Sequence, residues 1–229
     1  MPVNPADSEV FGTLYGSDAM RAVFDDRAWL QRMLDVEAAL ARVEARLGLI
    51  PAEAALAITG AARLANLDLA ALAEATRTVG YPVVGLVKGL NRAAGAAGRW
   101  THWGATTQDI MDTALVLQIR DGIDLITAAL AGIATALVQQ AEIHRHTLMS
   151  GRTHLQHALP ITFGLKCALW LQPMLAHLDR LAELRPRVLV VQFGGAAGTL
   201  AALGDQGIAV MEALAAELGL AAPPAPWHV

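Results

Sequence analysis

The sequence predicts an all-α protein in which a small helical domain precedes part of a long-helix bundle. Its 229 residues are 55% hydrophobic and only 5% aromatic, so aliphatic and small side chains carry the apolar content, which suits closely packed helices. Apolar residues recur at helical spacing, and no proline interrupts residues 107–146. We therefore expect an N-terminal helical domain at residues 1–100 and a partial central bundle domain at residues 101–229.

The first long helix of the N-terminal domain is predicted to start at Asp25 or Asp26, either of which can cap it. Gly48 and Pro51 supply a stop signal after about Leu47. Side chains spaced by three and four residues form one apolar stripe, which we interpret as core; they are Met33, Val36, Leu40, Val43 and Leu47.

Shorter helices are expected to follow in the first hundred residues. Pro51 is suited to the first position of a helix, and Asp68 can cap another helix that ends near Gly80. Residues 81–90 start a further apolar segment, and the small residues of 93–100 mark a boundary.

Two long helices are predicted in the second half. The first covers residues 107–146, about 40 residues or roughly 60 Å, and therefore needs a bundle or other subunits to cover it. The second is expected from near Pro160 to Arg185, with a kink or interruption at Pro173 and a stop at Pro186.

The remaining residues predict one more helix. Five glycines between residues 194 and 207 break the helical pattern, and residues 205–219 resume it before the extended proline-rich segment.

Charge and composition argue against several classes of protein. The net charge is -4 and no Lys/Arg cluster occurs, so we expect neither nucleic acid nor an anionic membrane as a partner. The apolar stretch 122–138 contains Asp124 and is shorter than the roughly 20 residues that a bilayer needs. No secretory signal is visible and Cys167, the one cysteine, is interpreted as a core thiol, so we expect a cytoplasmic protein.

Polar side chains concentrate in two segments, THWGATTQD at residues 101–109 and GRTHLQHALP at residues 151–160. Each precedes or opens a predicted long helix. Helix N-termini offer free backbone N–H groups and a partial positive charge, so hydroxyl and amide groups placed there can hold a carboxylate. This pattern predicts a site for a small anionic substrate.

Structural interpretations of the same residues stay open at this point. Thr106 and Thr107 can be plain helix caps, Asp109 can simply oppose the helix dipole, and His102 can pack under its loop. His154 is able to donate or accept a proton, or to contact a carboxylate, near neutral pH.

We expect no metal site and no cofactor. The other histidines of this region lack a metal-binding arrangement of neighbouring Glu or Cys, and no phosphate-binding glycine loop occurs; these histidines are His144, His146 and His157.

The segments THWGATTQDIMDTAL and GRTHLQHALPITFGLK resemble the first two signature regions of the fumarase/aspartase superfamily, and four further blocks extend the resemblance over nearly the whole chain. Within it, the chain is similar to the 3-carboxy-cis,cis-muconate cycloisomerase family, with the adenylosuccinate lyase family as the alternative. Adenylosuccinate lyases typically carry an arginine where this chain has Leu14, and a histidine where it has Tyr81. Leucine cannot pair with phosphate, so the nucleotide substrate is disfavoured.

This resemblance implies the site residues and the reaction. The substrate-binding positions of the first signature match Thr106, Thr107 and Gln108, and those of the second match Thr153 and Gln156. His154 matches the second signature as the candidate catalytic residue. The implied reaction is reversible lactonisation of a tricarboxylate to 4-carboxymuconolactone in aromatic degradation by the protocatechuate (beta-ketoadipate) route, without a cofactor.

The resemblance also implies a longer, oligomeric protein. The superfamily's third signature, a GSSxMPxKxNP-like loop with the catalytic serine, does not occur in these 229 residues. We therefore expect a fragment that is inactive alone and lacks the rest of the bundle and the C-terminal domain. Family members are homotetramers whose sites combine residues of three chains. A non-catalytic helical oligomerisation module is the alternative from a different class.

Overall fold

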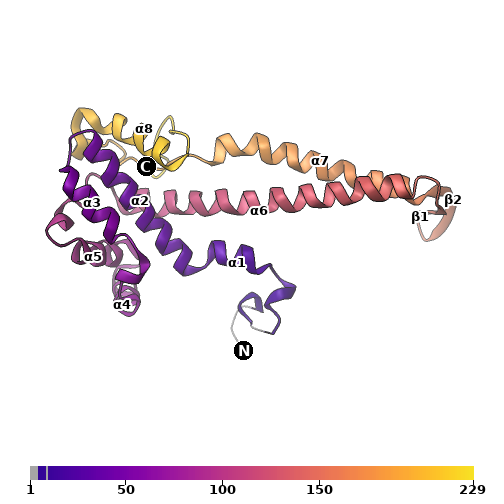
Figure 1. Cartoon of the computed structure of the whole chain (residues 1–229), viewed down its shortest axis with the longest axis horizontal. Helices are drawn as coiled ribbons and strands as arrows, with labels where there is room; N and C mark the ends of the chain where they lie inside the picture. Colours follow the sequence, from indigo (N-terminus) through magenta and orange to yellow (C-terminus); the bar gives the residue numbers. More distant parts are fainter. Residues whose placement is uncertain (1–4, 9) are drawn as a thin grey trace. The chain divides into compact units, whose positions relative to one another are not determined.

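The computed structural model describes residues 5–8 and 10–229, which form two compact units. Unit 1 comprises residues up to Asp121 together with Val188–Val229, and unit 2 comprises Gly122–Arg187. The predicted all-α class is confirmed, since helices dominate and the described residues contain one small two-stranded sheet (Figure 1). The expected domain boundary at residue 100 stays a prediction.

Unit 1 contains seven α-helices, the sixth of which continues into unit 2: α1 Asp18–Phe24, α2 Asp26–Arg46, α3 Ala52–Ala61, α4 Leu69–Val79, α5 Val83–Ala94, α6 Thr107–Ile143 and α8 Gly207–Leu218. Its described residues also form short 3-10 helices: η1 Pro5–Asp7, η2 Gly12–Leu14, η3 Leu64–Asn66, η4 Gly95–Trp100 and η5 Ala201–Gln206.

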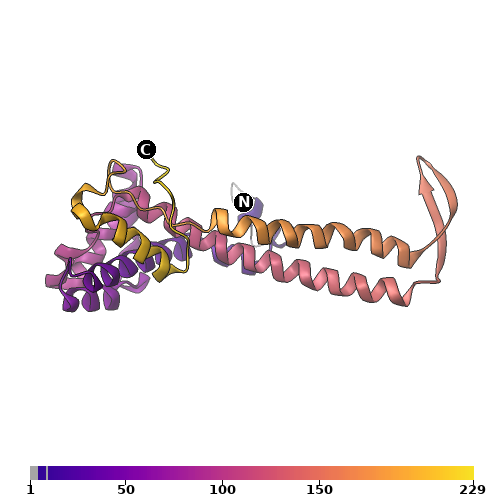
Figure 2. The same ribbon diagram turned by 90° about the horizontal axis from the view of Figure 1, so that it is seen from above.

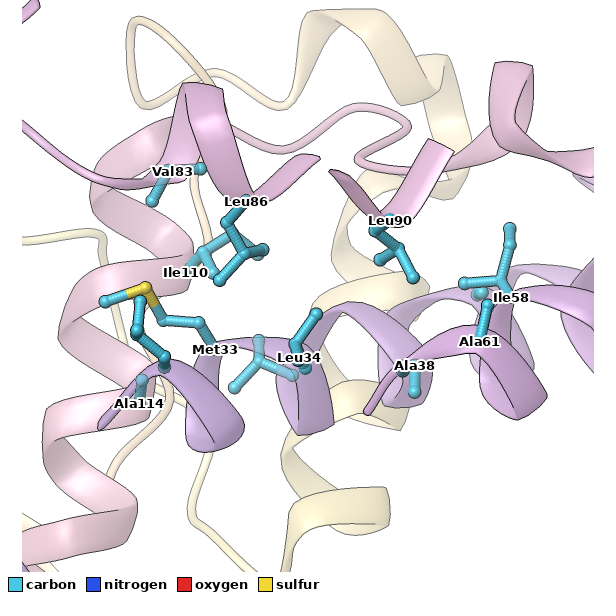
Figure 3. Packing of buried hydrophobic residues seen from close by; sticks show 14 of the residues in the cluster. Met33, Leu34, Ala38, Ile58, Ala61, Val83, Leu86, Leu90, Ile110 and Ala114 are labelled. Atoms are coloured by element: carbon cyan, nitrogen blue, oxygen red, sulfur yellow. The ribbon is translucent and has the colours of Figure 1, made fainter. Parts of the chain in front are cut away.

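Helix α2 is the centre of unit 1 because it contributes to two clusters of buried side chains. Met33 and Leu34 pack with residues of α3, α5 and the first turns of α6 (Figure 3). Leu40 and Val43 pack with α8 and with Phe193. Burial of each large aliphatic side chain stabilises the fold by about 1.5–3 kcal/mol. The predicted apolar stripe is confirmed for Met33, Val36, Leu40 and Val43, while Leu47 follows the end of α2 and is partly buried against the second cluster.

The N-terminal caps of α2 and α4 follow the sequence signals. Asp25 caps α2 by accepting a hydrogen bond from the backbone N–H of Ala28 at 2.6 Å. Asp68 caps α4, which ends at Gly80 in the left-handed conformation with φ 90°. Pro51 lies one residue before α3, at its N-cap, rather than at its first helical position.

Charged side chains fasten α8 to the rest of unit 1. Glu217 accepts hydrogen bonds from Arg42 Nε and pairs with Arg46 Nη2, both at 2.8 Å. Arg120 donates to the carbonyl oxygen of Leu218, at the last residue of α8, at 2.8 Å. The predicted helix at residues 205–219 is thus confirmed, within two residues at its start.

Unit 2 consists of the remainder of α6, a β-hairpin and all but the last residue of helix α7 Phe163–Val188, with α7 running beside α6 (Figure 2). The first predicted long helix is confirmed, although α6 ends at Ile143 instead of His146. Helix α7 continues through Pro173 without interruption, and it ends two residues beyond the predicted stop at Pro186. Proline keeps a helical φ and removes one hydrogen bond, so a packed helix can pass through it. Cys167 is buried in α7 as expected.

A β-hairpin joins the two long helices, in a segment where the sequence predicted only the approach to a helix. Strand β1 Leu148–Thr153 pairs antiparallel with β2 Gln156–Thr162, and a register shift falls between Ser150 and Arg152. A Cβ at Gly151 would lie 2.6 Å from the carbonyl oxygen of Leu159, so the shift requires glycine there. Pro160, expected to open the helix, lies inside β2.

Helix α6 is long and apolar enough to cross a membrane by length and composition, with a mean hydropathy of 1.6 in its most apolar window. The expectation that the apolar part of this helix is too short to span a membrane is therefore wrong. Long core helices of soluble proteins pass the same test, so hydropathy alone does not decide the role of α6.

Candidate functional site

The first polar cluster lies at the N-terminus of α6, where Thr106 precedes the helix and Thr107 and Gln108 open it. The backbone N–H of Thr106 donates to Asp109 Oδ2 at 2.9 Å. Among the described residues, the hydroxyl groups of Thr106 and Thr107 have no hydrogen-bond partner, and both residues are partly exposed. These hydroxyls therefore do not cap the helix, and they are free to meet a ligand.

Asp109 organises this helix start from inside the protein. Its side chain is fully buried. Oδ1 accepts from Gln192 Nε2 at 3.1 Å and from the backbone N–H of Gly194 at 2.9 Å, and Oδ2 also accepts from the N–H of Gly195 at 2.9 Å. Four donors thus satisfy the carboxylate, so the interpretation as a mere partner of the helix dipole was incomplete.

Gln192 extends the network to the last residues of the chain. Its backbone exchanges two hydrogen bonds with the hydroxyl of Thr113, at 2.8 and 3.0 Å. Its side-chain oxygen accepts from the backbone N–H of Trp227 at 3.1 Å, and its amide nitrogen lies 2.5 Å from His228 Nδ1. A Cβ at Gly194 would lie 2.6 Å from Pro226, so the glycine allows this close approach.

Gln108 is held by its own helix. Its amide nitrogen donates to Asp112 Oδ1 one turn further along α6. The other oxygen of Asp112 accepts from the indole N–H of Trp227 at 2.7 Å. The predicted substrate-binding amide is therefore fixed on one side before any ligand arrives.

The buried carboxylate of Glu37 holds the loop that leads into α6. Glu37 Oε1 lies 2.6 Å from His102 Nδ1, and Glu37 Oε2 accepts from the backbone N–H of His102 at 3.1 Å. Burial lowers the pKa of His102, but the hydrogen bond to Glu37 and the charges of Glu37 and Asp109 outweigh it and raise the pKa overall. His102 therefore carries more positive charge near neutral pH than an ordinary histidine.

Sequence reasoning missed this pair, although it left a signal. Glu37 directly follows Val36 of the apolar stripe on α2, and only 1% of Glu37 is exposed. A carboxylate in such a position requires a partner, because an unpaired buried charge is strongly destabilising.

Glu44 lies two turns beyond Glu37 on α2 and is also buried. Neither of its carboxyl oxygens has a hydrogen-bond partner among the described residues. Burial, followed by repulsion from Glu37, raises the pKa of Glu44 to about 9. The side chain is therefore protonated at neutral pH.

The second polar cluster forms the tip of the hairpin in unit 2. Thr153 pairs with Gln156 across a two-residue turn made by His154 and Leu155, and Leu155 has φ 57°. All four residues are exposed. His154 is thus accessible to a ligand or to another chain, and its catalytic role stays a prediction.

The six predicted site residues therefore fall into two groups of three, one in each unit. Thr106, Thr107 and Gln108 offer hydroxyl and amide groups at a helix start, which can bind and orient a carboxylate. The residues of the hairpin tip are an imidazole, a hydroxyl and an amide. Within residues 5–8 and 10–229, no three His, Cys, Asp or Glu side chains converge as a metal site would require.

Fold and site together define a class of protein: residues 14–228 match the family described as Lyase, and the chain belongs to this family, within the fumarase/aspartase superfamily. Among particular proteins, it is 52% identical to the 3-carboxy-cis,cis-muconate cycloisomerase of Pseudomonas aeruginosa over 96% of this chain and 49% of that protein. The crystal structure of the 3-carboxy-cis,cis-muconate lactonizing enzyme from Pseudomonas putida matches with a TM-score of 0.93 and 50% identity, over 96% of this chain and 51% of that one.

The alternative enzyme family is also related, but less similar. The adenylosuccinate lyase of Pyrococcus horikoshii is 39% identical over 96% of this chain and 48% of its own length. The chain thus spans about half the length of the curated relatives that it matches.

Proposed function

We propose that the protein containing this chain is a 3-carboxy-cis,cis-muconate cycloisomerase, acting in the cytoplasm without a cofactor. The carrying observation is the 52% identity to a cycloisomerase over nearly the whole chain, together with Leu14 and Tyr81 at the positions that disfavour a nucleotide substrate. In the reaction, a carboxylate oxygen forms a bond to one carbon of a double bond while a proton is added at the adjacent carbon.

The first cluster supplies the anion-stabilising part of this mechanism. Negative charge builds on a substrate carboxylate as the proton moves at the neighbouring carbon. The free hydroxyls of Thr106 and Thr107 and the N-terminus of α6 donate toward that charge, and preorganised donors of this kind contribute about 3 kcal/mol each.

Thr153, His154 and Gln156 of the hairpin are proposed to contribute to an active site that the assembled protein forms from more than one chain. His154 contacts a carboxylate or assists the proton transfer, and its exposed position leaves it available for either role. A His154→Ala variant of a full-length protein carrying this segment tests the assignment. We expect kcat/KM for the muconate to fall at least about a hundredfold, the usual contribution of a general acid or base. A near-normal kcat/KM removes His154 from the mechanism.

The protein is also proposed to be a homotetramer. Large apolar side chains of unit 2 are exposed along both long helices, and a second chain could cover them: Ile126, Ile133, Val138, Ile143, Leu165, Leu169, Trp170, Leu175 and Leu184. Light scattering of a full-length protein carrying this segment tests this, and a monodisperse monomer contradicts it.

The same exposed faces favour the second candidate, a non-catalytic oligomerisation module. Titration calorimetry with a tricarboxylate analogue separates the two, because a module shows no saturable binding that Thr107→Ala weakens. A direct comparison of the muconate with adenylosuccinate as substrates of the full-length protein decides between the two enzyme families. We expect the 229-residue chain alone to turn over neither.

A further inference from the structure

We propose that Asp112 and Trp227 are positioning residues that hold the side-chain amide of Gln108 in one orientation, with its N–H group toward Asp112 and its carbonyl oxygen away from it. The inference deepens the proposed function, since it concerns how one predicted substrate-binding residue meets its ligand. All three residues lie in unit 1.

The orientation follows from what each group can donate or accept. The amide nitrogen of Gln108 is bonded to Asp112 Oδ1, and an ionised carboxylate only accepts hydrogen bonds. A reversed amide would place its carbonyl oxygen against this carboxylate, which is repulsive. Asp112 therefore selects one of the two amide orientations.

Trp227 in turn fixes Asp112. Its indole N–H donates to Asp112 Oδ2 at 2.7 Å, so both carboxylate oxygens have a partner. The indole N–H can donate a hydrogen bond but cannot accept one, so this contact has only one possible direction. The carboxylate is thus held by a group from the far end of the sequence.

The backbone of Trp227 is also connected, through Gln192 and Asp109, to Thr106. Its N–H donates to Gln192 Oε1 at 3.1 Å, and Gln192 Nε2 donates to Asp109 Oδ1 at 3.1 Å. Asp109 accepts from the backbone of Thr106. One residue near the C-terminus is therefore connected to both Thr106 and Gln108, the two ends of the predicted binding turn.

The arrangement restricts what Gln108 can offer a ligand. One N–H is used by Asp112, so one N–H and the carbonyl oxygen remain. Gln108 can donate to a single carboxylate oxygen, while its carbonyl oxygen opposes a second anionic oxygen. We infer that it selects the position of one substrate carboxylate rather than binding it from both sides.

A structural experiment tests the relay without any activity. In the 229-residue chain, the side-chain amide of Gln108 is followed by 15N NMR, with its resonances assigned through Gln108→Glu. We expect Trp227→Phe and Asp112→Asn each to shift these resonances, whereas Asp121→Asn leaves them unchanged. Asp121→Asn is the matched control because it removes the same charge from α6. In the unsubstituted protein, Asp121 pairs with Arg32 at 2.6 Å. Unshifted resonances in both test variants overturn the proposal.

A kinetic cycle tests the consequence in a full-length protein carrying this segment. Trp227→Phe is expected to raise KM for the muconate roughly fivefold, the value of one net hydrogen bond, with kcat nearly unchanged. Combined with Gln108→Ala, it should add nothing, because Trp227 acts through Gln108. Additive effects, or an unchanged KM in Trp227→Phe, overturn the proposal. A wild type without turnover refutes the proposed function, and the NMR result then still decides on the relay.

Discussion

Glu37 and His102 form a 2.6 Å contact across 65 residues of sequence, and this contact connects the central helix of unit 1 to the loop that opens α6. His102 has φ 61°, a left-handed conformation that is uncommon for residues with a side chain. The two hydrogen bonds to Glu37 hold this backbone conformation in place.

Replacing His102 by asparagine isolates the charge of this pair. Asparagine tolerates positive φ, so the backbone is preserved while Glu37 loses its cationic partner. We expect His102→Asn to lower the free energy of unfolding by about 3 kcal/mol. Because the pKa of His102 is raised in the folded state, the charged pair stabilises fully below the unfolded pKa of about 6.5, and this stabilisation is lost as pH rises through the folded pKa. Urea unfolding at pH 6 and pH 9 checks this, and a loss of equal size at both pH values contradicts it.

Glu44→Gln should change how stability depends on pH. The pKa of Glu44 is about 9 in the folded protein and near 4.5 when unfolded, so unfolding releases a proton between these values. The free energy of unfolding of the wild type then falls by up to about 1.4 kcal/mol per pH unit across this window. The glutamine variant has no ionisable group at this position and lacks this pH dependence. The stability of Glu44→Gln relative to wild type should therefore rise from pH 5 to pH 8. Parallel pH profiles of the two proteins would refute a raised pKa.

Asp109→Asn is expected to destabilise unit 1. In the variant, the N–H of asparagine faces donors that bond to a carboxylate oxygen in the wild type. The loss of these hydrogen bonds to a buried charge lowers the free energy of unfolding by about 3 kcal/mol. The matched control is Asp68→Asn, since asparagine caps a helix as well as aspartate does and Asp68 is exposed. Chemical denaturation compares the two. Equal stabilities would show that the four hydrogen bonds of Asp109 contribute little.

Two glycines of unit 2 should respond in opposite directions to alanine. A Cβ at Gly164 would lie 2.5 Å from the carbonyl oxygen of Ala141 and 2.8 Å from that of His144, at the junction of hairpin and helix. Gly164→Ala is therefore expected to destabilise by about 1–3 kcal/mol. Gly132 lies in α6 with nothing within 4 Å of its Cβ position, so Gly132→Ala should stabilise the chain by about 1 kcal/mol. Thermal unfolding of the 229-residue chain distinguishes them, and a stable Gly164→Ala would refute the close packing at this junction.

Local sequence signals predicted most of the helices. They did not predict the paired strands of the hairpin or the contacts between side chains that are distant in the sequence. The caps at Asp25 and Asp68 act within three residues of themselves, so their effect is readable from the sequence. The hairpin at residues 148–162 was missed because its strands are largely exposed and carry no clear alternation of apolar and polar residues. The pairing of the two strands depends on which backbone groups meet, and no single residue in the sequence indicates this.

The candidate site shows the same division. The prediction of an anion site depends on the residue types of Thr106, Thr107 and Gln108 at a helix start, because helix N-termini and hydroxyl donors have intrinsic chemistry, and it stays a prediction. The roles of Asp109, Gln192 and Trp227 were not predictable, since their partners lie up to 115 residues away in the sequence.

By itself, the sequence determined the helical class, the positions of the long helices and the two polar segments, because spacing and capping act over a few residues. The tertiary structure alone decided that Glu37 contacts His102, that Asp109 accepts from four donors, and that Gln108 and Trp227 both donate to Asp112. The physical reason is that a buried polar group must find a partner wherever the folded chain brings one within hydrogen-bond distance, and that distance is unrelated to separation along the sequence.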